Sequence, residues 1–144
     1  NILTSKMNSN QFKIMVALVA RGDEDSVIKQ AAFYVEKLQA RLTAIHVNQP
    51  ALSQPKGAVE QRVTEKMIRE RFITSGFENI LNNTDIIIEY GENVSKIIST
   101  HSGDMDLIIL GHRKMNTFKS RIMDSIDEGI SNLVACPVLV VQKN

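Results

Sequence analysis

The sequence lacks several features that mark common classes of protein. Its single cysteine, Cys136, excludes an internal disulfide bond. No apolar run approaches the roughly 18 residues that a membrane-spanning helix needs, and no signal-peptide pattern is present. We therefore expect a cytoplasmic protein that is not inserted in a membrane.

An excess of charge of one sign is also missing. The 17 basic and 16 acidic residues leave a formal net charge of +1, so no overall field favours nucleic acid or an acidic membrane surface as a partner. Hydrophobic residues make up 43% of the 144 residues, which suits one globular domain with a single core. We expect no second domain and no nucleic acid partner.

Catalytic patterns are absent as well. The sequence has no catalytic carboxylate pair, no nucleophile elbow and no Walker loop, which argues against an enzyme. His46, His101, His112 and Cys136 are not spaced as metal ligands. His46 is expected to be hydrogen-bonded in a strand, His101 to end a helix, and Cys136 to be structural.

Apolar patterns alternate between those of strands and those of helices. Continuous apolar runs predict strands at 14–19, 42–47, 86–88, 107–110 and 138–141. Residues 1–11 are predicted to be a flexible segment before a domain over 12–144. Because the chain has no hairpin signal, the alternation predicts a single-domain α/β fold with a five-stranded parallel sheet and helices on both faces. The predicted core includes Val16, Leu18, Ile45, Ile108, Ile109 and Val140.

Helical spacing fills the gaps between these strands. One helix is predicted to run to about residue 40, with Val27, Ala31, Val35 and Leu38 as its buried stripe. A long helix is predicted from about residue 59 through Val63, ended or bent at Gly76, and a short one follows Asn93. A last helix is predicted from Phe118 to Leu133.

Residues 105–125, MDLIILGHRKMNTFKSRIMDS, form the most informative stretch. A buried strand is predicted to end at Gly111, and a polar loop then leads into the last helix. Free backbone N–H groups and the helix dipole converge at such a loop, so α/β folds bind anionic groups there. Arg113, Lys114 and Ser125 could hold a small anion, and the alternative is a solvated loop with nothing bound.

This stretch also carries a resemblance to a known family. Residues 104–112 (DMDLIILGH), the segment FKS at 118–120 and CPVLVV at 136–141 resemble the universal stress protein family over about residues 13–142. The resemblance implies a Rossmann-like, adenine nucleotide alpha hydrolase-like fold with strand order 3-2-1-4-5. In that order a ligand crevice lies between the first and fourth strands, lined by residues 19–23 and 111–125.

Within this family, the residues resemble the branch named after universal stress protein A, which is regarded as not binding ATP. The ATP-binding branch has an aspartate at the end of the first strand and a G-x2-G-x9-G-[ST] loop. Gly111 and Ser125 keep the loop spacing, but Val19 stands at the aspartate position, Lys114 at the second glycine and Asp124 at the third. The resemblance therefore implies no tightly bound cofactor, with ATP or AMP as the alternative. Asp23 is interpreted as a helix cap, with a role in place of the missing aspartate as the alternative.

The resemblance implies a homodimer formed through the last strand. Val138, Leu139, Val140 and Val141 would lie at a sheet edge, where unpaired backbone groups and apolar side chains need cover. Two interpretations stay open: a stand-alone dimeric stress-response protein, or a regulatory domain cut from a larger chain such as a transporter. The first residue, Asn1, allows either a start at Met7 or a longer parent chain. A nucleotide or anion sensor is the third alternative.

Overall fold

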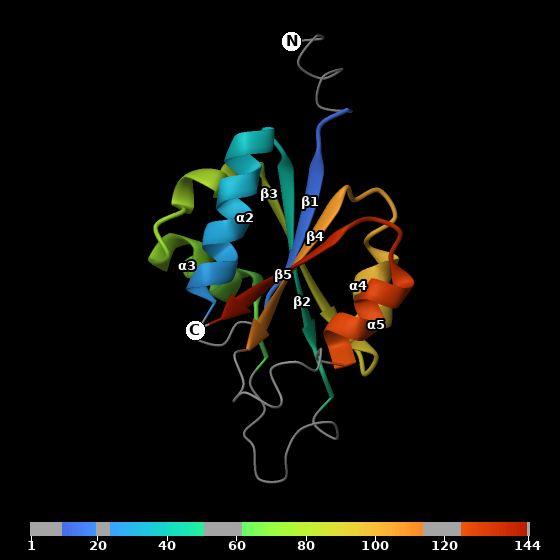
Figure 1. Cartoon of the computed structure of the whole chain (residues 1–144). Helices are drawn as coiled ribbons and strands as arrows, with labels where there is room; N and C mark the ends of the chain where they lie inside the picture. Colours follow the sequence, from blue (N-terminus) through green and yellow to red (C-terminus); the bar gives the residue numbers. More distant parts are fainter. Residues whose placement is uncertain (1–9, 20–23, 51–61, 114–124, 144) are drawn as a thin grey trace.

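The computed structural model describes residues 10–19, 24–50, 62–113 and 125–143 (Figure 1). Five strands form one parallel sheet in the order β3-β2-β1-β4-β5. The predicted fold class and strand order are therefore confirmed. The strands are β1 (Lys13–Ala17), β2 (Arg41–Asn48), β3 (Thr84–Tyr90), β4 (Leu107–Arg113) and β5 (Val138–Lys143).

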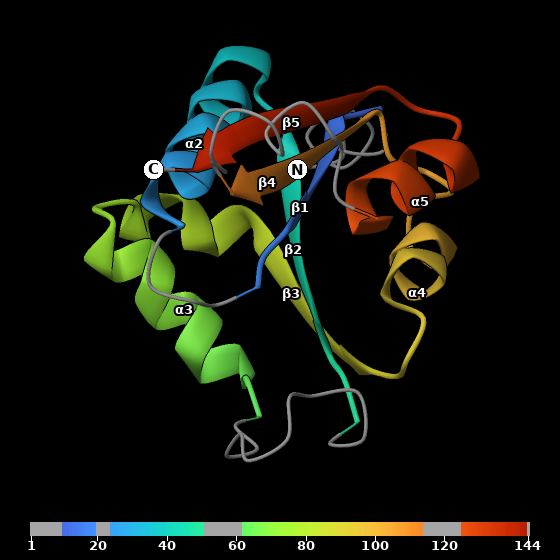
Figure 2. The same ribbon diagram turned by 60° about the horizontal axis from the view of Figure 1, so that its bottom comes forward.

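Helices cover both faces of this sheet. The described helices are α2 (Asp25–Leu38), α3 (Glu65–Thr74), the 3₁₀ helix η2 (Glu78–Asn83), α4 (Val94–Thr100) and α5 (Ser125–Leu133). Figures 1 and 2 show α2 and α3 on one face and α4 and α5 on the other. None of the helices in the described ranges is long and apolar enough to cross a membrane.

The core has two halves because β1 lies in the middle of the sheet. Ile14 and Val16 pack into the cluster under α2 and α3, whereas Met15 packs into the cluster under α4 and α5. All three side chains are fully buried. A continuous apolar strand is the expected sequence for a strand covered on both faces.

Five of the six predicted core residues are buried, and Val140 is not. Val16, Leu18, Ile45, Ile108 and Ile109 are each at most 3% exposed, but Val140 is 36% exposed. β5 is an edge strand, and its neighbours Leu139 and Val141 pack on the cluster under α2. Val140 points to the opposite face, where it is only partly covered.

Two predicted stripe residues are exposed because they end their helices. Leu38 is the last residue of α2 and is 44% exposed; Gln39 then takes a left-handed conformation (φ 49°) that stops the helix. Leu133 ends α5 and is 54% exposed, while Val134 just after it packs on the core. The helical period therefore continues past the point where the sheet lies beneath the helix.

The start of the helix predicted from residue 59 lies outside the described residues; within them α3 begins at Glu65, and Val63 is not part of it. The Thr64 side chain accepts a hydrogen bond from the Met67 N–H at 3.3 Å and so caps the start of α3. The Asn48 amide pairs with the Val63 backbone, accepting from its N–H at 2.9 Å and donating to its C=O at 3.0 Å. The Asn48 side chain therefore holds Val63 against the end of β2, before the helix begins. After α3, Gly76 (φ 88°) makes the turn predicted there.

Polar contacts fix the amino ends of β1 and β4. The Asp106 carboxylate accepts from the Lys13 N–H at 2.9 Å, and the Asp106 N–H donates to the Lys13 C=O at 2.8 Å. The Lys13 ammonium lies 3.1 Å from Asp104, and this hydrogen bond lowers the pKa of Asp104. The resulting register pairs Ala17 with Leu110, so the end of β1 lies beside Gly111.

Truncation of Ile109, which is fully buried in β4, tests the position of the core. Ile109→Ala should lower the free energy of unfolding by about 2–5 kcal/mol because it leaves a cavity at the centre of the sheet. Urea denaturation measures the loss. Ile73→Ala is the matched control and should cost far less, since Ile73 is 45% exposed on α3. Equal losses for the two variants would contradict the packing described above.

Candidate functional site: a crevice at the carboxyl ends of β1 and β4

A small cavity lies where the carboxyl ends of the central strands meet, at the lower end of the sheet in Figure 1. Its volume is about 130 Å³. β1 and β4 lie side by side there, and the helices that follow them, α2 and α5, lie on opposite faces of the sheet. Open α/β sheets bind ligands at such a point. The lining residues come from the ends of the three central strands and from α4: Ala17, Leu18, Val19, Ile45, His46, Val47, Gln49, Val94, Ile98, Leu110 and Gly111.

Two of the predicted crevice residues, Val19 and Gly111, both line this cavity. Val19 follows the end of β1, and its side chain is 44% exposed. An isopropyl group there offers no hydrogen bond to a ligand, so only its backbone could contribute one. Their role as ligand-binding positions stays a prediction.

The backbone groups at the end of β1 are engaged by side chains of the protein itself. The ring Nδ1 of His46 lies 2.7 Å from the Leu18 carbonyl oxygen. A carbonyl can only accept, so this nitrogen carries the proton and the neutral ring has its acceptor at Nε2. The next N–H, of Val19, donates to the Glu24 carboxylate at 2.8 Å.

Glu24 is the residue immediately before α2, and it is only 3% exposed. Its side chain does not cap the helix; it reaches back to Val19 and ties the start of α2 to the end of β1. A buried carboxylate needs such hydrogen bonds to offset the loss of water. The Val19 N–H on the β1 side of the crevice is therefore already bonded to a side chain of the protein itself.

Gly111 has a packing role that the sequence did not indicate. A Cβ at this position would lie 2.7 Å from Val27 Cγ2 of α2 and 2.8 Å from Lys143 Cε of β5. Both side chains are buried, and both lie against the bare backbone of β4. This glycine therefore allows α2 and the Lys143 stem to approach the sheet closely, whether or not a ligand binds.

The other predicted site residues fall at the borders of the described segments. β4 was predicted to end at Gly111, but it continues through His112 to Arg113 because residues 108–113 pair with β5. Arg113 is the last residue of β4, and Ser125 is the first residue of α5. Lys114, Asp124 and Asp23 lie outside the described residues, as do residues 118–124 of the predicted helix.

The remaining candidate side chains have structural surroundings. His101 is the C-terminal cap of α4, and its Nε2 lies 2.8 Å from the Glu89 carboxylate of β3. Cys136 packs in the cluster under α4 and α5, and burial raises the pKa of its thiol, which opposes thiolate chemistry. Among the described residues, no three His, Cys, Asp or Glu side chains come together as a metal site.

Sequence reasoning assigned neither His46 nor Gln49 to the crevice, and it did not predict the contact of Glu24 with Val19 beside it. His46 was expected to be hydrogen-bonded in a strand, which is confirmed, but its partner is 28 residues away. Glu24 was one acid among several at a helix start. The only local signal was that polar residues follow strand ends, and strand ends are where α/β folds place their sites.

The crevice is suited to a small, mostly apolar group. Aliphatic side chains form most of the wall, and the His46 ring and the Gln49 amide are its polar side chains. A 150 Å³ apolar cavity accepts benzene, whereas pockets for drug-sized ligands are about 300–1,000 Å³. The described walls therefore enclose space for roughly one ring.

With the crevice defined, the comparison with protein families is decisive. The model of the universal stress protein family matches residues 12–142. The chain belongs to the universal stress protein family. A comparison with curated protein sequences gave no match.

Solved structures of universal stress proteins have the same fold. The UspA protein of Lactobacillus plantarum is 20% identical, with a TM-score of 0.61, and the match covers 90% of this chain and 97% of that one. A universal stress protein of Archaeoglobus fulgidus DSM 4304 is 22% identical (TM-score 0.66), but the match covers 92% of this chain and only 44% of that chain.

A third relative, from Archaeoglobus fulgidus, was solved in complex with dAMP. It is 13% identical, with a TM-score of 0.57, and the match covers 90% of this chain and 97% of that one. At these identities the likeness shows a shared fold.

The packing role of Gly111 can be tested against a glycine with open space. Gly111→Ala should lower the free energy of unfolding by about 1–3 kcal/mol, because Val27 and Lys143 must shift to admit the methyl group. Gly103→Ala is the control, since a Cβ there would meet no atom within 4 Å. Urea denaturation compares the two. If Gly111→Ala were no more destabilising than Gly103→Ala, the close approach at Gly111 would be incorrect.

Proposed function

We propose that this universal stress protein domain acts in the cytoplasm as a non-catalytic homodimer in stress response or regulation, without tight ATP binding. The end of β1 is the observation that carries the proposal. Val19 replaces the aspartate of the ATP-binding branch, and the adjacent backbone groups already bond to His46 and Glu24. In these respects the domain resembles the branch named after universal stress protein A.

Binding adenosine at this point would require the protein to give up its own contacts. A ligand that needed the Val19 N–H would have to displace the Glu24 carboxylate, which lies 2.8 Å away and is almost fully buried. Leaving a buried carboxylate without its hydrogen bond costs about 1–3 kcal/mol or more. This cost lowers the affinity for any such ligand by at least about fivefold.

A nucleotide or small-anion sensor is the second candidate. It is favoured by the position of the cavity at the carboxyl ends of β1 and β4 and by the relative solved with dAMP. The ring-sized space beside Val94 and Ile98 could take a base, with Arg113 and Ser125 as candidates for an anionic group.

The dimer proposal rests on the outer edge of β5. In the described part of the chain no strand pairs with this edge, and Val140 is 36% exposed beside it. Leu139 and Val141 are only partly buried although they pack under α2. Pairing with a second β5 across a two-fold axis would satisfy the backbone groups and cover these side chains in one closed contact.

The domain could also serve as a regulatory part of a larger chain. The longer Archaeoglobus fulgidus relative, of which this domain matches 44%, supports that alternative. Both versions of the proposal give the domain a binding role and no catalytic one.

Isothermal titration calorimetry with ATP tests the nucleotide part of the proposal. At protein concentrations suited to micromolar affinity, the wild type should give no saturable heat. The triple variant Val19→Asp, Lys114→Gly, Asp124→Gly should bind ATP measurably, because it restores the acid and the two glycines that the ATP-binding branch has. A clear low-micromolar ATP site in the wild type would refute the proposal, and AMP binding alone would favour the sensor.

Sedimentation equilibrium tests the dimer part. The wild type should have twice the monomer mass, and Val140→Lys should weaken the dimer because it buries an ammonium group in an apolar contact. Ile73→Lys is the matched control, since Ile73 is 45% exposed on α3, away from β5. A monomeric wild type, or equal dimer affinity in both variants, would show that another contact covers the β5 edge.

A further inference from the structure

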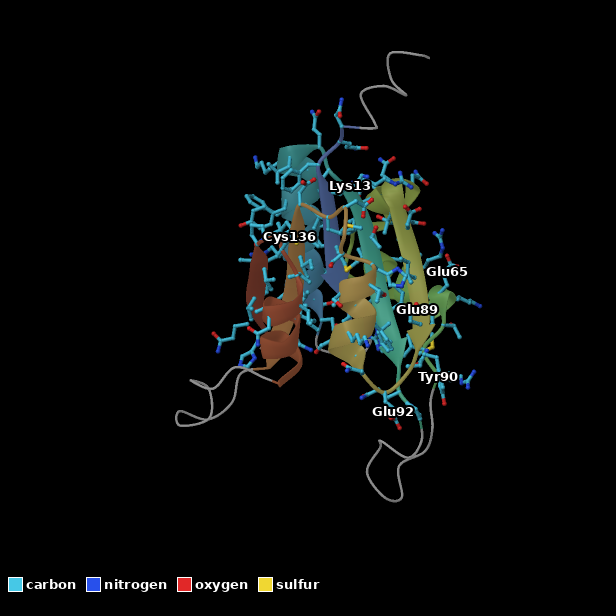
Figure 3. All side chains as sticks on the ribbon, turned by 90° about the vertical axis from the view of Figure 1, so that its right-hand side faces the viewer. Lys13, Glu65, Glu89, Tyr90, Glu92 and Cys136 are labelled. Atoms are coloured by element: carbon cyan, nitrogen blue, oxygen red, sulfur yellow. The ribbon has the colours of Figure 1, made fainter. Side chains whose placement is uncertain are left out.

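The second edge of the sheet, β3, has a chemistry of its own that the proposed function does not use. Among the described residues no strand pairs with the outer side of Thr84–Tyr90. An open groove of about 690 Å³ runs beside it, between β3 and the start of α3. Its lining residues are Asn48, Arg62, Val63, Thr64, Glu65, Ile86, Ile88, Glu89 and Tyr90. Figure 3 shows Glu65, Glu89 and Tyr90 on this side of the molecule, away from Cys136.

The two faces of β3 differ in character because side chains alternate along a strand. Ile86 and Ile88 face the α3 side and pack only partly into the core cluster there. Tyr90 lies two residues after Ile88 and so points to the same side of the strand. It is 51% exposed, and the Arg62 guanidinium lies 4.8 Å from its ring centre. The α3 side of this edge is therefore an apolar groove with an aromatic end.

The opposite face of β3 is acidic. Asp85 and Glu89 point to the same side of the strand as Ile87, which packs towards α4 and α5. The side chains of Asp85 and Glu89 are 59% and 41% exposed. Arg41 binds Asp85 through two contacts of 2.9 and 3.1 Å, and His101 binds Glu89. Glu65, at the rim of the groove, has no ion-pair partner among the described residues. Arg41 and the groove residue Arg62 thus supply two positive charges against the three carboxylates at this edge, and His101 adds a third only when it is protonated.

This charge pattern disfavours a second copy of the chain as the occupant. If two β3 strands paired antiparallel about Ile87, Asp85 of each copy would lie opposite Glu89 of the other. Like charges directly opposite one another destabilise a strand pair. A strand with basic side chains at those positions would instead be attracted.

We propose that the β3 edge binds an extended peptide segment whose side chains alternate between basic and apolar. The segment would add as a sixth strand, and its main chain would bond to the free edge of β3. Its apolar side chains would enter the groove against Ile86 and Ile88, and its basic side chains would lie opposite Asp85 and Glu89. Glu65 would add a contact at the start of α3.

Fluorescence anisotropy with the full chain and a labelled seven-residue peptide of alternating lysine and valine tests this proposal. The peptide should bind saturably below roughly millimolar concentration. Alternate backbone N-methylation should abolish binding because it removes main-chain donors, and a peptide of alternating glutamate and valine should bind at least about tenfold more weakly. In a ¹⁵N-labelled sample the shifted amides should lie within Thr84–Tyr90.

Charge-reversal variants locate the contact. Glu89→Lys should weaken binding about three- to tenfold, because an attractive pair becomes a repulsive one. Glu65→Lys should weaken it in the same direction without touching His101, so the test does not depend on one variant. Glu70→Lys, on an exposed position of α3 outside the groove, makes the same change in net charge and should leave binding unchanged.

Three results of the peptide measurements would overturn the proposal. They are equal binding of the N-methylated peptide, amide shifts that map to Val138–Lys143, and no binding at millimolar peptide. Equal losses with Glu70→Lys and Glu89→Lys would also overturn it, because attraction would then follow net charge and not the β3 edge. None of these results bears on ATP affinity, and only amide shifts at Val138–Lys143 would bear on the β5 edge.

Discussion

Burial of β1 on both faces and pairing along both of its edges is the constraint on which the rest of the structure depends. Ile14, Met15 and Val16 are fully buried, so helices must cover the sheet on both sides. Pairing with β2 and β4 places β1 at the centre. A parallel sheet with helices on two faces is the arrangement that satisfies both conditions.

The same arrangement creates the crevice and also limits what it can hold. The helices that follow β1 and β4 lie on opposite faces of the sheet, and a space opens between the carboxyl ends of these two strands. In this protein the side chains of His46 and Glu24 bond to the backbone at the end of β1, beside this space. Those contacts stabilise the junction of three elements, and they occupy groups that a ligand would otherwise use.

The two sheet edges differ in ways that suit different partners. At β5, valine and leucine side chains lie beside an unpaired backbone, and a symmetric partner can cover them without placing like charges together. At β3, the acidic residues Asp85 and Glu89 alternate with isoleucines and oppose self-pairing. Charge alternation along an edge strand is a known means of preventing unwanted strand addition while still admitting a complementary one.

The sequence by itself determined the succession of strands and helices along the chain and most of the core. Apolar runs such as residues 107–110 predicted strands buried on both faces. The burial of Val16, Leu18 and Ile109, which lie in such runs, was predicted in this way and is confirmed. The strand order and the departures from the ATP-binding pattern came from family resemblance and not from periodicity. Gly76 was also predictable, because a glycine within a helical pattern marks a bend.

Only the tertiary structure decided which side chains of each apolar pattern are buried and which residues far apart in the sequence come into contact. Periodicity gives the face on which Leu38 or Val140 lies but not where the covering layer ends, so both were placed in the core and both are exposed. The contact of His46 with Leu18 and the fit of Gly111 against Val27 join residues 28 and 84 positions apart. Such contacts depend on strand register and helix placement, and no local pattern in the chain encodes either.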